Sequence, residues 1–442
     1  MLDIWLFRDD KGGNSELIRE SQRKRFADVT LVDQVIAKDL EWRQSVVRRE
    51  KLRGQLNKVS KEIGKLRKAG ADDSELREST IEIKKEIDVI DSREAALLEE
   101  RDDILKRIGN LVEPHVHVSQ NEEVNRVVST YEPSTPPEFP AKYGHVELLH
   151  MIGAVDYERG SKVAGNRGYF LTGPGVRLNM GLIMLGLNFL SDRGYTPMHT
   201  PYMVKPEVMA ATCQLSDFED QLYGVGSAPD LSFLIATSEQ PLSAFHMKEW
   251  LSDHDLPRKY AGYSTCFRKE VGSHGRDTLG IFRTHQFDKV EQLCVTGPEK
   301  SQEMFQEMIT NAKQFLELLE LPYREVEIVS GALNNAAAIK HDLEAVFRHS
   351  GTFRELVSCS NCTDYQSRRL DIRYRAFKTG PSKGAEKQYV HLLNSTLTAT
   401  ERMLCCIVEH YQTESGVQVP LALRPFVGTD FLPFVNAVPE KK

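Results

Sequence analysis

Two short runs of charged and aromatic residues carry side chains suited to binding a polyanion. They are Cys266-Phe267-Arg268-Lys269-Glu270 and Gly280-Ile281-Phe282-Arg283-Thr284-His285-Gln286-Phe287. Side chains two apart on an extended strand share a face, so each run presents charge, or charge and a ring, on one surface. A guanidinium binds phosphate or carboxylate bidentately, a carboxylate accepts from an amine, and a ring stacks on a base. These are the parts of an ATP site.

The same alternation also fits an ordinary charged hairpin with one face in solvent, and the runs alone do not separate the two. Between them, residues 271–279 are rich in glycine and polar side chains, which is typical of a mobile loop that approaches a ligand. The chain contains neither a G-x-x-x-x-G-K-[ST] loop nor a G-x-S-x-G elbow. These absences disfavour a P-loop nucleotide site and a serine hydrolase.

Three further stretches, 235–242, 355–366 and 394–411, concentrate polar residues. The third places Arg402 near the start of an apolar helix, where a buried arginine needs an anionic partner, either a ligand or an internal carboxylate. The second contains a single CxxC. Because a structural zinc site needs four ligands and the other cysteines supply no second pair, we expect no zinc.

The amino-terminal quarter has the spacing of two helices paired in a coiled coil. Apolar residues from Leu52 to Leu66 step by four and three, and a second series from Ile83 to Leu111 keeps heptad phase. Glu94 and Arg101 interrupt the second series. With a turn at 69–74, the pattern predicts an antiparallel helical hairpin with arms of about 30–68 and 75–111. Each arm would be on the order of 50 Å long, so we expect a projecting stalk.

The first arm carries a basic stripe, although the formal net charge of the chain is -7. Such a stripe is a footprint for a nucleic-acid backbone. A solvated surface with interhelical ion pairs is the alternative. The candidate contact residues are Arg43, Arg48, Arg49, Arg53, Lys58, Lys61 and Lys65.

Composition indicates how the rest of the chain is divided into domains and in which compartment the chain resides. A proline-rich segment separates the helical quarter from a remainder whose mixed strand and helix signals predict an α+β domain. We therefore expect an N-terminal domain at 1–115, a linker at 116–140 and a catalytic domain at 141–442. No apolar stretch is long enough to span a membrane, and acids near the start disfavour a transit peptide. Seven cysteines without a disulfide pattern suit the cytoplasm.

The first two runs resemble the second signature motif of class II aminoacyl-tRNA synthetases. The wording of residues 267–275 and 285–291 is similar to the seryl-tRNA synthetase version, in particular that of the eukaryotic cytosolic branch. Residues 193–201 resemble the family's first motif, a dimerisation element, and 394–411 its third. Residues 235–242 are similar to the family's Thr-x-Glu loop, which holds the substrate amino group. The resemblance spans almost the whole chain.

The resemblance implies a largely antiparallel sheet flanked by helices, a homodimer and a serine–tRNA ligase activity. L-serine and ATP would give seryl-adenylate and pyrophosphate. The serine would then pass to the 3′ end of tRNA(Ser), and to tRNA(Sec) by shared shape, for cytosolic translation. The hairpin would embrace the long variable arm of the tRNA, reading shape and phosphates more than bases.

The resemblance also assigns roles to residues. Arg268 would bridge the α-phosphate and the serine carboxylate, Glu270 would meet the adenine amine and Phe287 would stack on adenine. The catalytic set is Arg268, Glu270, Arg283 and Arg402. The ATP site comprises Arg268, Lys269, Glu270, Arg283, Thr284, Phe287, Glu355, Leu356, Val357, Ser358 and Arg402, with Mg²⁺ on Glu355 and Ser358. The serine pocket comprises Thr237, Ser238, Glu239, Arg268, Glu291, Asn394 and Thr396.

Two other functions remain open. A catalytically inactive synthetase-like paralogue would bind RNA or regulate, but such proteins usually lose motif residues that this chain retains. An adenylating enzyme that serves a carrier protein would have little use for a tRNA-binding hairpin.

Overall fold

The computed structural model describes residues 1–213, 221–271, 280–377 and 385–439. The chain divides into two compact units, Met1–Leu111 and Val112–Lys442. The glycine-rich loop expected to approach a ligand lies, from residue 272 to 279, outside the described residues. Within the described ranges, no helix is both long enough and apolar enough to cross a membrane.

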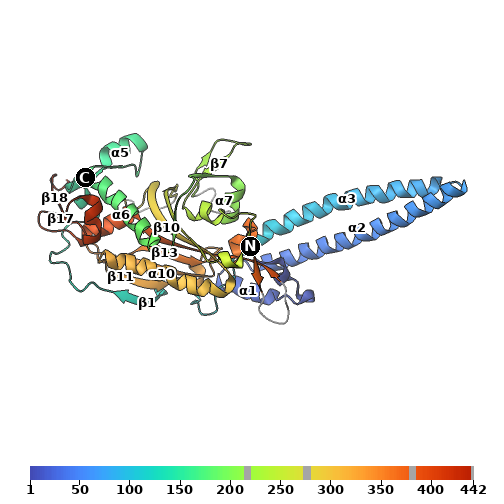
Figure 1. The fold of residues 1–442 in the computed structure, drawn as a ribbon, viewed down its shortest axis with the longest axis horizontal. Helices are drawn as coiled ribbons and strands as arrows, with labels where there is room; N and C mark the ends of the chain where they lie inside the picture. The colour runs from blue at the N-terminus through green and yellow to red at the C-terminus, as the bar shows by residue number, and fades with distance from the viewer. Residues whose placement is uncertain (214–220, 272–279, 378–384, 440–442) are drawn as a thin grey trace. The chain divides into compact units, whose positions relative to one another are not determined.

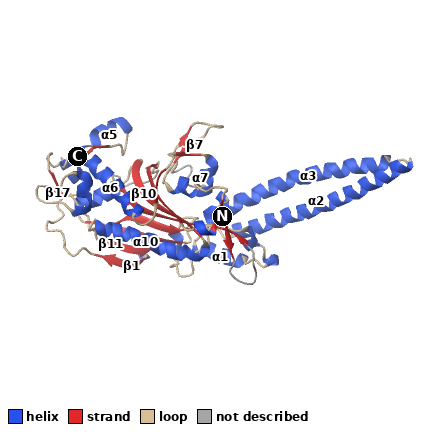
Figure 2. Ribbon diagram, viewed as in Figure 1, coloured by secondary structure: helices blue, strands red, loops and turns tan. Residues whose placement is uncertain are grey.

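The first unit is helical, and two long helices dominate it (Figures 1 and 2). A short helix, α1 (Ser15–Lys24), precedes α2 (Thr30–Ala69) and α3 (Ser74–Leu105). Gly70 ends α2 with φ 67°, the left-handed conformation that favours glycine at a helix end. The chain reverses there, and α2 packs along α3 in antiparallel order. The predicted helical hairpin is therefore confirmed.

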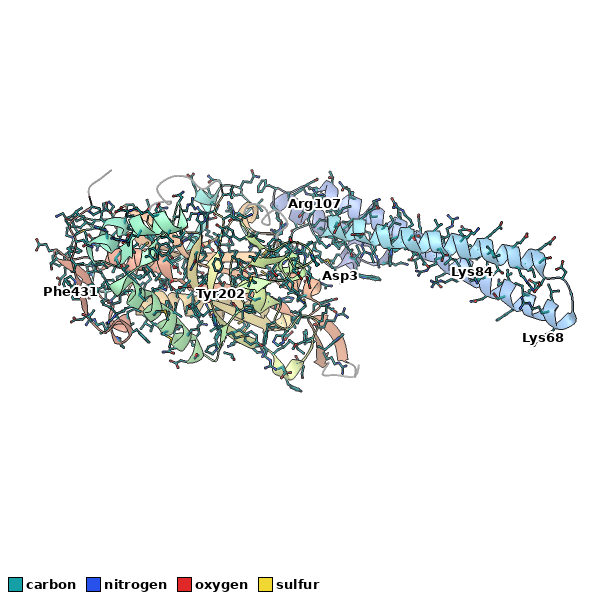
Figure 3. All side chains as sticks on the ribbon, turned by 90° about the horizontal axis from the view of Figure 1, so that it is seen from above. Asp3, Lys68, Lys84, Arg107, Tyr202 and Phe431 are labelled. Carbon is teal, nitrogen blue, oxygen red and sulfur yellow. The ribbon has the colours of Figure 1, made fainter. Side chains whose placement is uncertain are left out.

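Apolar contacts between α2 and α3 follow the predicted seams. Leu52, Ile87 and Ile90 form a buried cluster, with Leu56 and Ile83 packed against it. Elsewhere the two helices present polar side chains to solvent along their length, out to the tip near Lys68 (Figure 3). The seam thus holds the hairpin together while most of its surface stays charged.

The second arm is shorter than the sequence predicts, because α3 ends at Leu105 and not near 111. The side chain of Arg25 lies where a Cβ at Gly109 would be, 2.7 Å from that position, and Arg25 Nε donates to the Asn110 carbonyl at 2.8 Å. Gly109 is a poor helix former, and α1 occupies the space of a further turn. Ile108 is buried, but it lies beyond the end of α3 and outside the apolar cluster that α2 and α3 share.

The interrupted seam positions hold ion pairs inside the unit. Glu94 is buried and accepts from Arg49 Nη1 at 2.7 Å. Arg101 is buried and donates to Asp39 at 3.1 Å. Asp39, which is fully buried, also accepts from Arg8 at 2.8 Å. Burial alone would raise the pKa of Asp39, yet Arg8 and Arg101 hold it below its ordinary value.

Replacing Asp39 by alanine is expected to lower the free energy of unfolding by about 3–5 kcal/mol, because Arg8 and Arg43 lose their ion pairs with it and buried Arg101 keeps only its pair with Asp102. Urea unfolding followed by circular dichroism measures the change. Glu41→Ala, at an exposed position two residues away on the same helix, is the control and should shift the midpoint little. Equal midpoints for the two variants would show that the Asp39 cluster does not stabilise the unit.

The second unit is built on an eight-stranded sheet with the order β1-β11-β12-β13-β16-β10-β9-β4. All neighbours are antiparallel except β4 and β9, which are parallel. This antiparallel-rich sheet confirms the predicted fold class. The strands are β1 (Arg126–Tyr131), β4 (Thr196–His199), β9 (Arg258–Phe267), β10 (Gln286–Thr296), β11 (Tyr323–Glu327), β12 (Ile339–Phe347), β13 (Thr352–Asn361) and β16 (His391–Ala399).

Helices pack against the sheet and enclose a large apolar core (Figure 1). Smaller sheets, with the orders β15-β14-β8, β5-β7-β6, β17-β18 and β2-β3, lie outside it. Their strands are β2 (Val155–Asp156), β3 (Phe170–Leu171), β5 (Met203–Val204), β6 (Gly224–Val225), β7 (Ser232–Leu234), β8 (Trp250–Ser252), β14 (Arg373–Phe377), β15 (Ala385–Tyr389), β17 (Gly416–Gln418) and β18 (Phe431–Pro433). The helices are α4 (His145–Met151), α5 (Tyr157–Ala164), α6 (Gly173–Ser191), α7 (Pro206–Thr212), α9 (Glu239–Ser243), α10 (Ser301–Leu318), α11 (Tyr365–Leu370), α12 (Thr400–His410) and α13 (Arg424–Val427).

The segment 116–140, expected to be a linker, is only partly one. Its residues Arg126–Tyr131 form β1, the edge strand of the sheet, so this part belongs to the second unit. The run Arg-Val-Val-Ser-Thr-Tyr is rich in β-branched residues, which favour strands. The prolines that follow it led to the prediction of a linker across the whole segment. Residues 132–140 contain no helix or strand.

The two charged runs extend beyond the strands that carry them. β9 ends at Phe267 and β10 begins at Gln286, so Arg268, Glu270 and Arg283 lie in the adjoining connections. Glu270 has φ 51°, which is not an extended conformation. The alternation that we expected to align Arg268 with Glu270 is therefore wrong. Polar backbone contacts, including Arg268 N–H to the His285 carbonyl at 2.9 Å, hold the two connections side by side instead.

Candidate functional site

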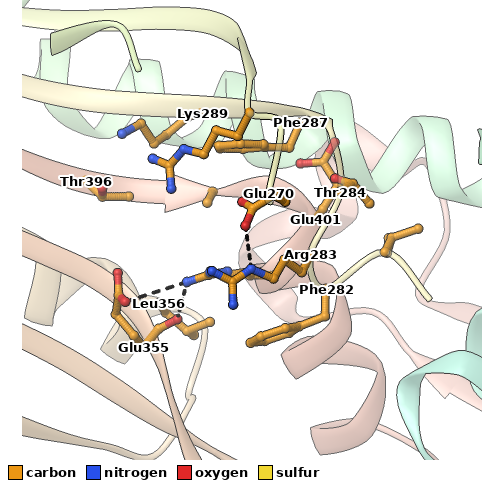
Figure 4. A pocket seen from close by; sticks show the side chains of 14 residues that line it. Glu270, Phe282, Arg283, Thr284, Phe287, Lys289, Glu355, Leu356, Thr396 and Glu401 are labelled. Atoms are coloured by element: carbon orange, nitrogen blue, oxygen red, sulfur yellow. Dashed lines mark hydrogen bonds and ion pairs between the residues drawn. The ribbon is translucent and has the colours of Figure 1, made fainter. Parts of the chain in front are cut away.

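A pocket opens where β9 and β10 meet the connection between them (Figure 4). The sheet, the start of α12 and the middle of β13 supply its walls. Predicted residues that line it are Arg268, Glu270, Arg283, Thr284, Phe287, Glu355, Leu356, Thr396 and Arg402. Ile281, Phe282, Lys289, Ala399 and Glu401 complete the lining. The structure thus brings together side chains that are up to 134 positions apart (402 − 268).

Three guanidinium groups give the pocket its positive charge. Arg268 lies with Cζ 5.2 Å from the ring centroid of Phe287, and its Nε donates to the Ala236 carbonyl at 3.2 Å. Arg402 lies with Cζ 5.0 Å from the ring of Phe282, and its Nη1 is 3.8 Å from the Glu355 carboxylate. Planar cations fixed against rings in this way are suited to holding several phosphate groups.

The third guanidinium has a partner within the pocket. Arg283 Nε donates to Glu270 Oε2 at 2.6 Å, as Figure 4 shows. The carboxylate of Glu270 is buried. Glu270 therefore orients Arg283 in this structure. To contact an adenine amine, Glu270 would use its other carboxylate oxygen, Oε1, or would first release Arg283.

Three predicted nucleotide residues lie away from the lining. Val357 is fully buried in the apolar core, so its side chain is unable to touch a nucleotide there. The Lys269 N–H donates to the Gln221 carbonyl at 3.0 Å. Ser358 lies opposite Asp342 in the β12–β13 pair and hydrogen-bonds to its carboxylate, and burial raises the pKa of Asp342 to about 7.

The oxygen donors near Glu355 fit a hard cation. Glu355 is exposed at the pocket, and the buried Oδ1 of Asp342, opposite Ser358, has no hydrogen-bond partner among the described residues. Magnesium takes few protein carboxylates and completes its shell with phosphate and water. Across the described residues, no group of three or more His, Cys, Asp and Glu side chains is placed to hold a metal ion. The cysteines of the CxxC, Cys359 and Cys362, are buried and are not joined in a disulfide.

A second polar cluster adjoins the pocket at β10. Glu291, 2% exposed, pairs across the sheet with Thr396 and accepts from the Thr237 hydroxyl at 3.2 Å. Lys289, 6% exposed, donates to Thr237 Oγ1 at 2.7 Å and forms an ion pair with Glu291. These contacts join the Thr-x-Glu loop to the central strand.

Glu239 forms the other side of this cluster. Gln366 Nε2 donates to Glu239 Oε1 at 2.8 Å and to the Thr212 carbonyl at 3.3 Å. Burial, together with the charge of Glu291, raises the pKa of Glu239. A bound ammonium group would compensate the Glu239 carboxylate. Ser238, the middle residue of the Thr-x-Glu loop, is fully buried.

Asn394 lies farther along β16, where its Nδ2 is 3.5 Å from Cys362 Sγ. Lys289, Gln366 and Glu401 contact or line the site and are absent from the predicted set. Lys289 follows Phe287 by two residues on β10, so the alternation that selected Phe287 and Glu291 also indicated Lys289. Gln366 ends the polar stretch 355–366, but no spacing within that stretch indicated its contact with Glu239.

Glu401, at the start of α12, is a buried carboxylate that spans the back of the pocket. Its Oε1 accepts from the Tyr169 hydroxyl at 2.8 Å, and its Oε2 accepts from the Asp288 N–H at 3.0 Å. Burial, with a contribution from the charge of Asp288, raises the pKa of Glu401 to about 7. The folded state therefore binds an extra proton between the ordinary pKa, near 4.5, and about 7.

Stability of the wild-type protein should fall as pH rises through that window, because ionising buried Glu401 is unfavourable. Glu401→Gln stays neutral, so relative to wild type it should gain about 2–3 kcal/mol in unfolding free energy between pH 5 and pH 8. Urea unfolding at both pH values measures the gain. Glu158→Gln, at an exposed position, is the control. A difference independent of pH would contradict the assignment.

The candidate basic residues of the hairpin fall into three groups. Arg43 donates to Asp10 at 2.8 Å, and Arg49 is held by Glu94, so both serve ion pairs inside the first unit. Arg48 and Arg53 are exposed and lie near carboxylates. The remaining three candidates are exposed and form no ion pair within residues 1–111, all of which the structure describes: Lys58, Lys61 and Lys65.

Known proteins resemble this chain over both units. Residues 1–112 match the family model of the seryl-tRNA synthetase N-terminal domain, and residues 228–411 match that of the tRNA synthetase class II core domain (G, H, P, S and T). The chain is 52% identical to a serine–tRNA ligase of Helianthus annuus, over 99% of this chain and 100% of the relative.

Two solved structures are similar over nearly the full length. The cytoplasmic serine–tRNA ligase of Naegleria fowleri, in complex with AMP, has a TM-score of 0.88 and 45% identity, with 99% of each chain covered. The seryl-tRNA synthetase of Pyrococcus horikoshii, complexed with ATP, has a TM-score of 0.90 and 38% identity, covering 99% of this chain and 100% of the other.

Proposed function

The chain belongs to the seryl-tRNA synthetase family, and on that premise we propose that it activates L-serine with ATP and transfers the serine to tRNA(Ser). The observation that carries the proposal is the junction of two sites. A pocket with three arginines and a stacking ring adjoins a polar cluster of half-buried Thr237 and Glu239 and buried Glu291. A nucleotide and a small amino acid bound there would meet at Arg268.

The first step is attack of the serine carboxylate on the α-phosphorus of ATP, with pyrophosphate leaving. Arg268 would hold both reacting groups, Phe287 would stack on adenine, and Arg283 with Arg402 would hold the phosphate tail. Thr284 and Leu356 line the nucleotide side, and Lys269 and Val357 would contribute backbone contacts. Catalysis comes from orientation and charge stabilisation, with no covalent enzyme intermediate.

Glu355 and Ser358 would hold the magnesium ion implied by the family. When bound, magnesium neutralises phosphate charge. The carboxylate of Glu355 stands 3.8 Å from Arg402, so the same edge of the pocket would carry the cation and the tail of the triphosphate.

Serine would bind with its ammonium group near Thr237 and Glu239 and its hydroxyl near Glu291 and Thr396, with Ser238 and Asn394 shaping the pocket. An alanine side chain lacks the hydroxyl and would leave buried polar groups unpaired, so alanine should be rejected strongly.

The first unit would bind the tRNA backbone through Lys58, Lys61 and Lys65, with Arg48 and Arg53 nearby. Arg43 and Arg49 support the unit by their internal pairs instead. Recognition of a long variable arm by shape would extend to tRNA(Sec). We place this activity in the cytoplasm, as the relatives named cytoplasmic suggest.

A homodimer follows from the family and from an exposed apolar stripe on α6. Val176, Met180 and Met184 are four residues apart along one face, and each is more than 40% exposed. A second copy covering this face would remove the stripe from water. Light scattering should give twice the chain mass, and a monomer mass would contradict the dimer.

Charging of tRNA with labelled serine tests the proposed function. We expect product with a tRNA(Ser) transcript, less when its long variable arm is deleted, and product with tRNA(Sec). Adenylation without charging of any tRNA would favour a carrier-protein substrate. Neither adenylation nor charging would favour an inactive RNA-binding paralogue.

A further inference from the structure

Lys289 is a buried ammonium group to which no function has yet been assigned. It lies on β10 between Phe287 and Glu291 and is 6% exposed. Its Nζ donates to Thr237 Oγ1 at 2.7 Å and pairs with Oε2 of Glu291. A lysine is rarely buried without a charged partner. The partner here is the carboxylate that would receive the substrate hydroxyl.

The contacts around Lys289 separate the roles of the two neighbouring carboxylates, Glu239 and Glu291. Glu239 has its own donor, Gln366, at 2.8 Å, while Lys289 and Thr237 are both directed to Glu291. Thr237 Oγ1 also accepts from the Glu239 N–H at 3.2 Å, so it cannot turn away from Glu291 without breaking that bond. Lys289 and Thr237 thus fix Oε2 of Glu291 in position.

Lys289 and Glu291 form a buried ion pair. Hydrogen bonds to a charged acceptor are stronger than those between neutral groups, and an unpaired charged acceptor is correspondingly more costly to bury. A serine hydroxyl would donate to the Glu291 carboxylate, whereas an alanine methyl would leave that acceptor unpaired.

We propose that Lys289 is a specificity-determining residue, which holds Glu291 as an oriented carboxylate and thereby makes recognition of the serine hydroxyl a charge-assisted hydrogen bond. The proposal rests on the serine-activating function proposed above. Lys289 acts through Glu291, so it is a positioning residue, and its removal affects discrimination more than it affects turnover of a substrate that is already bound.

The test compares serine with alanine in ATP–pyrophosphate exchange for wild type, Lys289→Met and Lys289→Arg. We expect Lys289→Met to lower the serine-to-alanine ratio of kcat/KM about tenfold, mainly through a higher KM for serine. Lys289→Arg keeps the charge and should recover part of the ratio. Lys259→Met is the matched control, because Lys259 is also partly buried in this sheet and pairs with Glu307 at 2.7 Å, outside the site.

If the Lys289→Met protein is too slow for the exchange assay, ligand binding is measured instead. The probes are the non-reactive sulfamoyl analogues of seryl- and alanyl-adenylate, whose Kd ratio should fall by the same factor. An unchanged ratio in either experiment, with both substrates weakened equally, would overturn the specificity role. Absence of serine-dependent exchange in wild type would instead overturn the proposed function itself, and the two failures are thereby distinguished.

Discussion

Replacing Arg268 by alanine is expected to lower kcat/KM for serine-dependent ATP–pyrophosphate exchange by about 10³-fold. Arg268 is the residue at which the nucleotide pocket and the Thr237 cluster meet, with its guanidinium 5.2 Å from Phe287 and its Nε bonded to the Ala236 carbonyl. Its charge would be needed most in the transition state, where the α-phosphate gains a fifth oxygen. The loss should therefore appear in kcat as well as in KM.

Arg258→Ala is the control for this variant. Arg258 lies at the other end of β9 and pairs with Asp255 at 3.0 Å. The control should retain exchange within about twofold, since partly exposed ion pairs contribute little. A small effect of Arg268→Ala on both constants would show that the reacting groups are held elsewhere.

Reversing Lys58, Lys61 and Lys65 together to glutamate should raise KM for tRNA about 10²-fold and leave exchange unchanged. These lysines are exposed and, within the first unit, have no carboxylate partner. Removing three phosphate contacts should also lower the salt dependence of tRNA binding by about three in slope. Charging assays and filter binding at several salt concentrations measure both effects.

Lys84→Glu with Lys85→Glu is the comparison on α3, where both residues are exposed. If the tRNA-binding surface is confined to α2, this pair of substitutions should raise KM for tRNA less than the triple variant does. Equal losses for the two sets would mean that overall charge, and not the stripe on α2, governs tRNA affinity. A loss of exchange in the triple variant would mean that the substitutions disturb the second unit.

Sequence patterns predicted which residues would gather in one pocket where the two paired strands carry them. Arg268, Phe287 and Glu291 stand near one another because β9 and β10 pair directly, as the two adjoining runs suggested. The pattern failed where a strand ends. Glu270 has a left-handed conformation that no alternation could reveal, and its present partner, Arg283, comes from the other connection.

Tertiary contacts explain what was missed. Gln366 reaches Glu239 from α11, and Glu401 reaches Tyr169 from α12, and neither pair is close in sequence. In the hairpin, the heptad pattern found the seam but treated Glu94 as an interruption. In the structure Glu94 accepts a hydrogen bond from Arg49, a residue of the basic stripe that was predicted to contact tRNA. Charge along one helix does not reveal which cations its partner helix neutralises.

ATP–pyrophosphate exchange with each amino acid in turn tests the central claim most directly. The account predicts strong exchange with serine, exchange with alanine lower by several orders of magnitude, and none without an amino acid. Exchange that prefers another amino acid, or no exchange with any, would contradict the assignment of the Thr237, Glu239 and Glu291 cluster as a serine site beside bound ATP.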